Sequence, residues 1–241
     1  MWSVCKKELR QFFSSLTGYI TIIVFLLVNG LVLFSFKGDD NIFDFGYATL
    51  ERFFQLAPWI LLLLIPAISM RSFADEYKTG TFEILQTRPL TSWQIIFGKY
   101  IASLIVVLLS LMPTVVYIFS IQRLSSGAGI DMGATIGSYI GLFFLASVFT
   151  AISICSSSFT TNSVVAFIAS LIGCALLYYG FSAISRLPAL ANGADYYVEM
   201  LGIDFHYRSI SRGLIDTRDL IYFLSLIFLF LTITNRNLKK R

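Results

Sequence analysis

Few residues of this 241-residue chain are of types that carry out chemistry. A hydrolase needs a nucleophile with a base beside it, yet the single histidine, His206, lies in a predicted loop, where we expect an exposed side chain. The pair Gly98-Lys99 ends like a phosphate-binding loop, but Trp93 stands where the first glycine should be. We therefore predict no catalytic residue and no nucleotide site in this chain.

The cysteines do not predict a metal site either. Cys5, Cys155 and Cys174 are odd in number, show no Cys-x-x-Cys spacing and have no histidine nearby. Zinc sites and disulfide frameworks need such spacing, so we expect three reduced packing residues. No metal and no cofactor of its own is predicted for the chain.

The composition is typical of an integral membrane protein. Hydrophobic residues make up 56%, the mean hydropathy is +0.77, and there are 23 phenylalanines. The net charge of +4 has a local explanation in clusters near the predicted inner surface, and nothing resembles a nucleic-acid-binding surface. The predicted span interiors offer neutral groups such as Asn29, Ser110 and Ser170, which disfavours a proton relay. Energy for transport must therefore come from a partner.

One polar stretch, the hinge at residues 71–93, lies between two long apolar segments. Six charges fall within it (Arg71, Asp75, Glu76, Lys78, Glu83 and Arg88). A stretch this polar cannot lie in lipid, and its basic ends place it in the cytoplasm. Gly80 can end a first helix, residues 82–87 predict a second short helix, and Thr91 with Gln94 has the spacing of a capping box. We expect Lys99 at the inner surface; a plain solvated linker is the alternative.

The residues of the hinge resemble a known family. Glu76, Gly80-Thr81, Glu83, Leu85, Pro89 and Gly98-Lys99 follow a pattern similar to the first cytoplasmic loop of ABC-2 type transporter permeases. The resemblance implies that this loop is the coupling helix, which docks on a separate ATP-binding subunit that binds the ATP and Mg. It also implies a second permease subunit, identical or different. The implied docking residues are Glu76, Gly80, Thr81, Phe82, Glu83, Leu85 and Arg88.

The amino-terminal segment, about residues 2–16, predicts an amphipathic helix in the headgroup plane. Trp2, Cys5, Leu9, Phe12, Phe13 and Leu16 share one face, while Lys6, Lys7, Arg10 and Gln11 share the other. Its opening, Lys7-Glu8-Leu9 followed by Phe12-Phe13-Ser14-Ser15, resembles the elbow helix of the same permeases. An ordinary juxtamembrane segment is the alternative.

Six membrane spans follow, so the predicted fold is an all-α, single-domain membrane protein over residues 1–241. The spans are expected at about 17–36, 53–70, 94–120, 134–155, 164–184 and 219–234. The acid-rich segment 37–51 and the longest loop, 186–216, are expected outside. Eleven of the 18 Lys and Arg residues then lie inside and seven outside, which places both termini in the cytoplasm. The resemblance implies a bacterial inner membrane.

Gly133, Gly137 and Gly141 form a ridge of small residues on the fourth span. Such ridges let another helix approach closely. We favour packing within the chain over a homodimer contact.

The outer segment 186–216 combines helical periodicity with charge. Tyr196, Tyr197, Met200, Leu201 and Phe205 predict an amphipathic helix on or in the membrane surface. The following run, Ser209 to Asp219, resembles the permeases associated with gliding motility, which implies an accessory membrane protein with a large outer domain. Its mixed Arg and Asp residues either cap the last helix or shape the outer mouth.

Two other functions fit the sequence. A scaffold that anchors a machine in the membrane would need the hinge only as a binding site. An ATP-independent channel or carrier would need a continuous polar stripe through the bundle.

Overall fold

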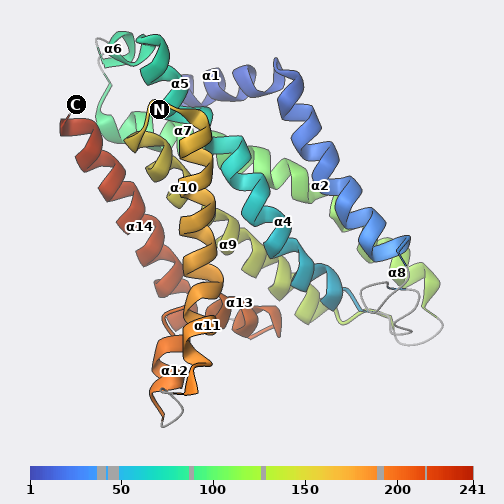
Figure 1. The fold of residues 1–241 in the computed structure, drawn as a ribbon. Helices are drawn as coiled ribbons and strands as arrows, with labels where there is room; N and C mark the ends of the chain where they lie inside the picture. The colour runs from blue at the N-terminus through green and yellow to red at the C-terminus, as the bar shows by residue number, and fades with distance from the viewer. Residues whose placement is uncertain are drawn as a thin grey trace.

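The structure is a computed structural model that describes residues 1–36, 42, 49–86, 90–125, 129–188, 193–214 and 216–240. Every secondary-structure element in these ranges is helical, which confirms the all-α prediction (Figure 1). The long elements are α1 (Trp2–Phe13), α2 (Leu16–Phe34), α4 (Glu51–Ser69), α7 (Ser92–Leu111), α9 (Met132–Phe159), α10 (Ser163–Ala175) and α14 (Thr217–Lys240). The shorter ones are α5 (Arg71–Thr79), α6 (Thr81–Gln86), η1 (Met112–Thr114), α8 (Val115–Leu124), η2 (Leu176–Gly180), α11 (Phe181–Ser185), α12 (Ala194–Glu199) and α13 (Ile203–Ser211).

Within the described residues, five helical segments are long and apolar enough to cross a membrane. They are Glu51–Thr79, Ser92–Leu124, Met132–Phe159, Ser163–Ser185 and Thr217–Lys240. A sixth is counted when α1 and residues Gly18–Phe34, which meet at 71°, are taken as one bent span. Five to six candidate spans agree with a multi-pass membrane protein. Most of the predicted loop 37–51 lies outside the described residues.

Two helices extend beyond their predicted spans. The polar, serine-rich residues 156–163 predict a turn between two spans, but the first four of them form the last turn of α9. There Ser156 and Ser158 donate to the Ile152 and Cys155 carbonyls of their own helix. The helix α14 continues to Lys240, and Asn237 Nδ2 donates to the Ser158 carbonyl at 2.6 Å. The ends of α9 and α14 are therefore fixed to each other at the same end of the bundle.

The helix α9 is the centre of the bundle and packs against α4, α5, α7, α10, α13 and α14. A larger apolar core surrounds its first half, and a smaller one, which includes Phe73, Phe82 and Tyr100, lies around its second half. Figure 1 shows α1, α5, α6 and both chain termini at one end, called here the hinge end. The helices α11, α12 and α13 lie at the other, called the opposite end.

The amino-terminal helix α1 packs along α7. Contact is close because position 98 is glycine: a Cβ there would lie 2.9 Å from Val4 Cβ. Of the residues expected on the apolar face of this segment, Cys5 is buried while Trp2 and Leu16 are exposed, and Val4, which was not assigned to that face, is buried as well. The side that carries Lys7 and Glu8 is turned toward α5 and α7, as their contacts below show.

The opposite end is built on the glycine ridge of α9. A Cβ at Gly137 would meet Gly213 Cα at 2.9 Å and the Ile210 oxygen at 3.0 Å, and a Cβ at Gly141 would meet Ile210 at 3.3 Å. A Cβ at Gly133 would meet only Asp131 of its own turn. Two of the three glycines therefore lie against α13 and the turn that follows it, within this chain.

The prediction for His206 was wrong: this side chain is buried in α13, with 4% of its surface exposed. Its Nδ1 lies 2.6 Å from Asp219 Oδ1, and its Nε2 lies 2.9 Å from the Met200 carbonyl oxygen. The ring stacks on Tyr222, with 3.9 Å between ring centroids. Folding of 203–211 as a helix against α9 and α14 removes this residue from solvent, which the loop assignment did not anticipate.

Candidate functional site

The hinge consists of two short helices joined at a glycine. Gly80 ends α5 with φ +69°, a left-handed conformation that side chains disfavour. Thr79 Oγ1 donates to the Asp75 carbonyl at 2.8 Å and lies 3.0 Å from Thr81 Oγ1. The next helix, α7, begins with the predicted capping box, since Gln94 N–H donates to Thr91 Oγ1 and Thr91 N–H to Gln94 Oε1.

The predicted docking residues fall into two groups. Gly80, Thr81 and Glu83 are exposed, and Leu85 is half-buried. Phe82 is buried against Tyr77, with 4.9 Å between ring centroids, and Glu76 is buried as well. Arg88 lies outside the described residues. Of the described docking residues, the exposed ones thus lie at the turn at Gly80 and the start of α6.

Lys99 lies beneath α5 and is buried there. Its side chain has 0% of its surface exposed, and its Nζ lies 2.8 Å from Glu8 Oε1 and 3.0 Å from Glu76 Oε2. It also donates to the Ser72 carbonyl at 2.6 Å and lies 4.9 Å from the Phe73 ring centroid. Lys99 is buried because α1 packs along α7 and covers this position.

Lys7 completes this charge cluster, defined here as Lys7, Glu8, Glu76 and Lys99. Lys7 Nζ donates to Glu76 Oε1 at 2.6 Å and, unlike Lys99, remains half-exposed. Two positive and two negative groups thus balance each other. A buried ammonium is costly unless carboxylates and hydrogen-bond acceptors surround it, and here both do. The cluster ties α1, α5 and α7 together at one point.

A second link connects the hinge to α9. Ser157 Oγ accepts hydrogen bonds from the backbone N–H groups of Phe73 and Ala74, at 3.1 and 3.2 Å, and donates to the Met70 carbonyl at 2.9 Å. A side chain that inserts among the backbone hydrogen bonds of a helix interrupts them and kinks the helix. This accounts for the junction of α4 and α5 at Met70. The prediction of a polar turn at residues 156–163 did not indicate that Ser157 binds the start of α5.

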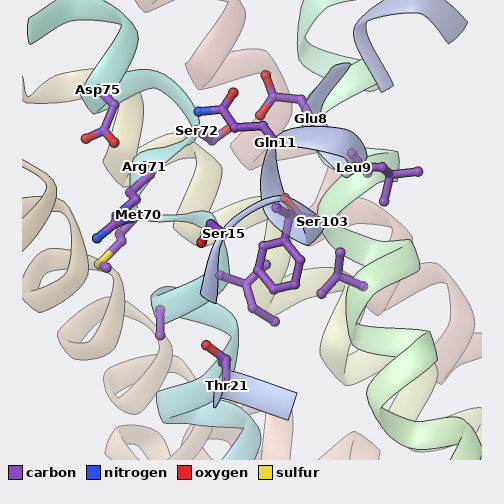
Figure 2. Close-up of a pocket in the computed structure, with 15 residues that line it drawn as sticks. Glu8, Leu9, Gln11, Ser15, Thr21, Met70, Arg71, Ser72, Asp75 and Ser103 are labelled. Carbon is purple, nitrogen blue, oxygen red and sulfur yellow. The ribbon is translucent and has the colours of Figure 1, made fainter. Parts of the chain in front are cut away.

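A cavity of about 210 Å³ adjoins the cluster. Figure 2 shows side chains from α1, α5 and α7 around it, among them Glu8, Ser72 and Ser103. Ser72 Oγ is buried there without a hydrogen-bond partner. The space under α5 is therefore not tightly packed, and of the charge cluster only Glu8 lines it.

The described residues contain no group of three or more His, Cys, Asp or Glu side chains placed to hold a metal ion. The three cysteines are buried and unpaired. What the hinge offers is therefore an exposed two-helix turn fixed to the bundle by buried polar contacts, an arrangement suited to binding and mechanical coupling.

A family model described as ABC-2 family transporter protein matches residues 2–235, nearly the whole chain. The chain belongs to this ABC-2 family. As an ABC-2 protein it is a permease component of the membrane, and its family implies an ATP-binding partner. The search of curated proteins finds no match.

Proposed function

We propose that this ABC-2 protein couples ATP hydrolysis by a separate subunit to export or transbilayer movement of a substrate. The charge cluster carries this proposal. An ATPase that moves the turn at Gly80 would displace α5, and the contacts of Glu76 with Lys7 and Lys99 would carry that displacement to α1 and α7. The ATPase would bind the ATP and Mg.

The proposal divides the hinge residues by role. Gly80, Thr81 and Glu83 would touch the ATPase, with Leu85 and Arg88 beside them. Glu76 and Phe82, whose side chains face the interior, would instead hold the docking surface in position. Both termini lie at the hinge end (Figure 1), so the same proposal places them in the cytoplasm of a bacterial inner membrane.

The test is reconstitution of the purified chain with the ATPase encoded next to it. We expect Glu83→Arg to lose complex formation and vanadate-sensitive stimulation of ATP hydrolysis, because the substitution reverses a charge on the exposed hinge. Asp216→Arg makes the same change at an exposed position directly before α14 and should leave both unchanged. Intact stimulation in Glu83→Arg contradicts the docking assignment.

The same experiment separates the alternatives. A scaffold would bind the ATPase without stimulating it, and a carrier that works alone would move solute without any ATPase. A role in gliding motility rests on the likeness of the Ser209 to Asp219 run, and it would require an accessory membrane protein. Co-purification with mass spectrometry tests that role and shows whether the second permease subunit is a copy or a different protein.

A further inference from the structure

A cavity of about 1180 Å³ opens at the opposite end of the bundle. One side is formed by the first turns of α4 and α9, and the other by η2, α13 and Arg186, which directly follows α11. Its α13 wall is held in place by Tyr207, whose hydroxyl donates to the Phe54 carbonyl at 2.7 Å. The glycine ridge of α9 lets α13 lie this close. The cavity is several times larger than the one beneath the hinge.

One wall of this cavity is aromatic. Trp59 lies between two consecutive tyrosines, with ring-centroid distances of 5.6 Å to Tyr178 and 5.5 Å to Tyr179. Both tyrosines belong to η2, a π-helical turn, a distortion that is frequent at functional sites. Trp59 and Tyr179 remain 47% and 40% exposed. They offer ring surface on which an apolar group can lie.

The acidic residues that line the cavity are already engaged. Asp131 accepts from the backbone N–H groups of Gly133 and Ala134, and Glu51 accepts from Gln55 Nε2 at 3.1 Å. Asp204 lies 2.8 Å from Arg208, which also donates to Glu199 at 2.6 Å. Burial lowers the pKa of the Arg208 guanidinium, but these two carboxylates outweigh it and hold the pKa above its ordinary value.

Two other arginines line the same cavity. Arg186 and Arg212 are exposed, and neither has a carboxylate within ion-pair distance in the described part of the chain. A guanidinium presents a planar fork of donors that matches a phosphate group. Since each carboxylate in the described lining of the cavity has another hydrogen-bond or ion-pair partner, these two side chains are available to an anion from outside.

We propose that this cavity binds a phosphate-bearing amphiphile, with the phosphate on Arg186 and Arg212 and the apolar part along Trp59 and Tyr179. Binding of this ligand does not depend on the hinge or on an ATPase. Only the further step, that this ligand is the transported substrate, rests on the function proposed above.

Trp59 can report the binding. Replacing Trp2 and Trp93, the other two tryptophans, by phenylalanine leaves a full-length chain with one fluorophore in the cavity wall. The chain is purified in dodecyl maltoside, a detergent without phosphate, and titrated with dihexanoyl phosphatidic acid, inorganic phosphate or dihexanoylglycerol. We expect a saturable change in Trp59 emission with the phosphatidic acid, at concentrations at least roughly tenfold below those of the other two probes.

Arginine variants locate the phosphate. Arg212→Gln and Arg186→Gln should each weaken phosphatidic acid binding roughly tenfold, because each removes a charged hydrogen-bond donor. Arg218→Gln removes the same charge at an exposed position outside the cavity and should bind normally. Thermal unfolding of each variant checks that the fold is intact.

Each other outcome overturns the proposal. Equal binding of inorganic phosphate indicates a free-phosphate site, and equal binding of dihexanoylglycerol indicates an apolar site. Equal losses in Arg218→Gln indicate a general charge effect. None of these results depends on the ATPase, so a failure here is distinct from a failure at the hinge.

Discussion

The hinge end and the opposite end both bury ionic groups, but for different structural purposes. At the hinge end Lys99 joins segments far apart in the sequence, since its Glu8 contact spans 91 residues. At the opposite end the His206–Asp219 pair spans only 13 residues and fixes α13 to α14. A cavity of about 1180 Å³ stays open at the same end of the bundle. Buried ionic contacts thus connect several helices at the hinge end, whereas the opposite end contains a large cavity.

This contrast indicates how one bundle can serve two tasks. A part that receives force must be connected to its neighbours by contacts that are costly to break, and buried ionic contacts have that property. A part that accommodates a ligand needs space lined by a few polar groups without partners in the chain. The predictions below test whether the buried contacts of the hinge end contribute more to stability than the helix packing of the opposite end does.

The largest effect is expected from Lys99→Met. Removing the ammonium leaves Glu8 and Glu76 partly uncompensated in the interior, which should cost about 3–5 kcal/mol. Thermal unfolding in detergent should show a decrease of about 10 °C, at about 2–4 °C per kcal/mol for a chain of this size. The matched control is Lys78→Met, which removes an exposed lysine of α5.

Adding Glu76→Gln to Lys99→Met should recover part of the loss, because one buried charge is then removed with its partner. Equal melting temperatures of Lys99→Met and Lys78→Met would show that the cluster does not hold the hinge.

The sequence predicted those features that local chemistry determines. The helical class follows from composition and periodicity, the capping box from the spacing of Thr91 and Gln94, and the end of α5 from Gly80. Each depends on residues within a few positions of one another. The span count follows from apolar length in the same way.

The charge cluster could not be found in this manner. Helical periodicity assigned Lys7 to a polar face, and Lys99 was expected at the inner membrane surface. A polar face can, however, be covered by another helix that carries the opposite charge. Glu76 was singled out through family resemblance, and its two lysine partners appear only when α1, α5 and α7 are placed together. For His206, the missing information was that the segment 203–211 packs against α9.

A smaller effect is expected from Ser157→Ala. The Phe73 and Ala74 N–H groups lose their shared acceptor, and the cost of leaving buried donors unpaired is about 1–3 kcal/mol. Ser156→Ala is the control, because Ser156 bonds only within α9. Hydrogen exchange should increase at Phe73 and Ala74 in Ser157→Ala and remain unchanged in the control. Unchanged exchange in both would show that α5 is not held through α9.

The smallest effect is expected at the opposite end, from Gly137→Ala. The added Cβ meets backbone atoms of Gly213 and Ile210 at 2.9 and 3.0 Å, so α13 must move, at a cost of about 1–3 kcal/mol. Alanine also favours the helix by about 1 kcal/mol, which reduces the net loss. Gly133→Ala gains the same propensity and meets only Asp131 Oδ1 at 3.3 Å, so it should be neutral or stabilising.

The melting temperatures of the two variants should therefore change in opposite directions, or by clearly different amounts. If both variants behave alike, the close approach of α13 to α9 does not limit stability, and the opposite end tolerates movement of α13 without loss of the fold.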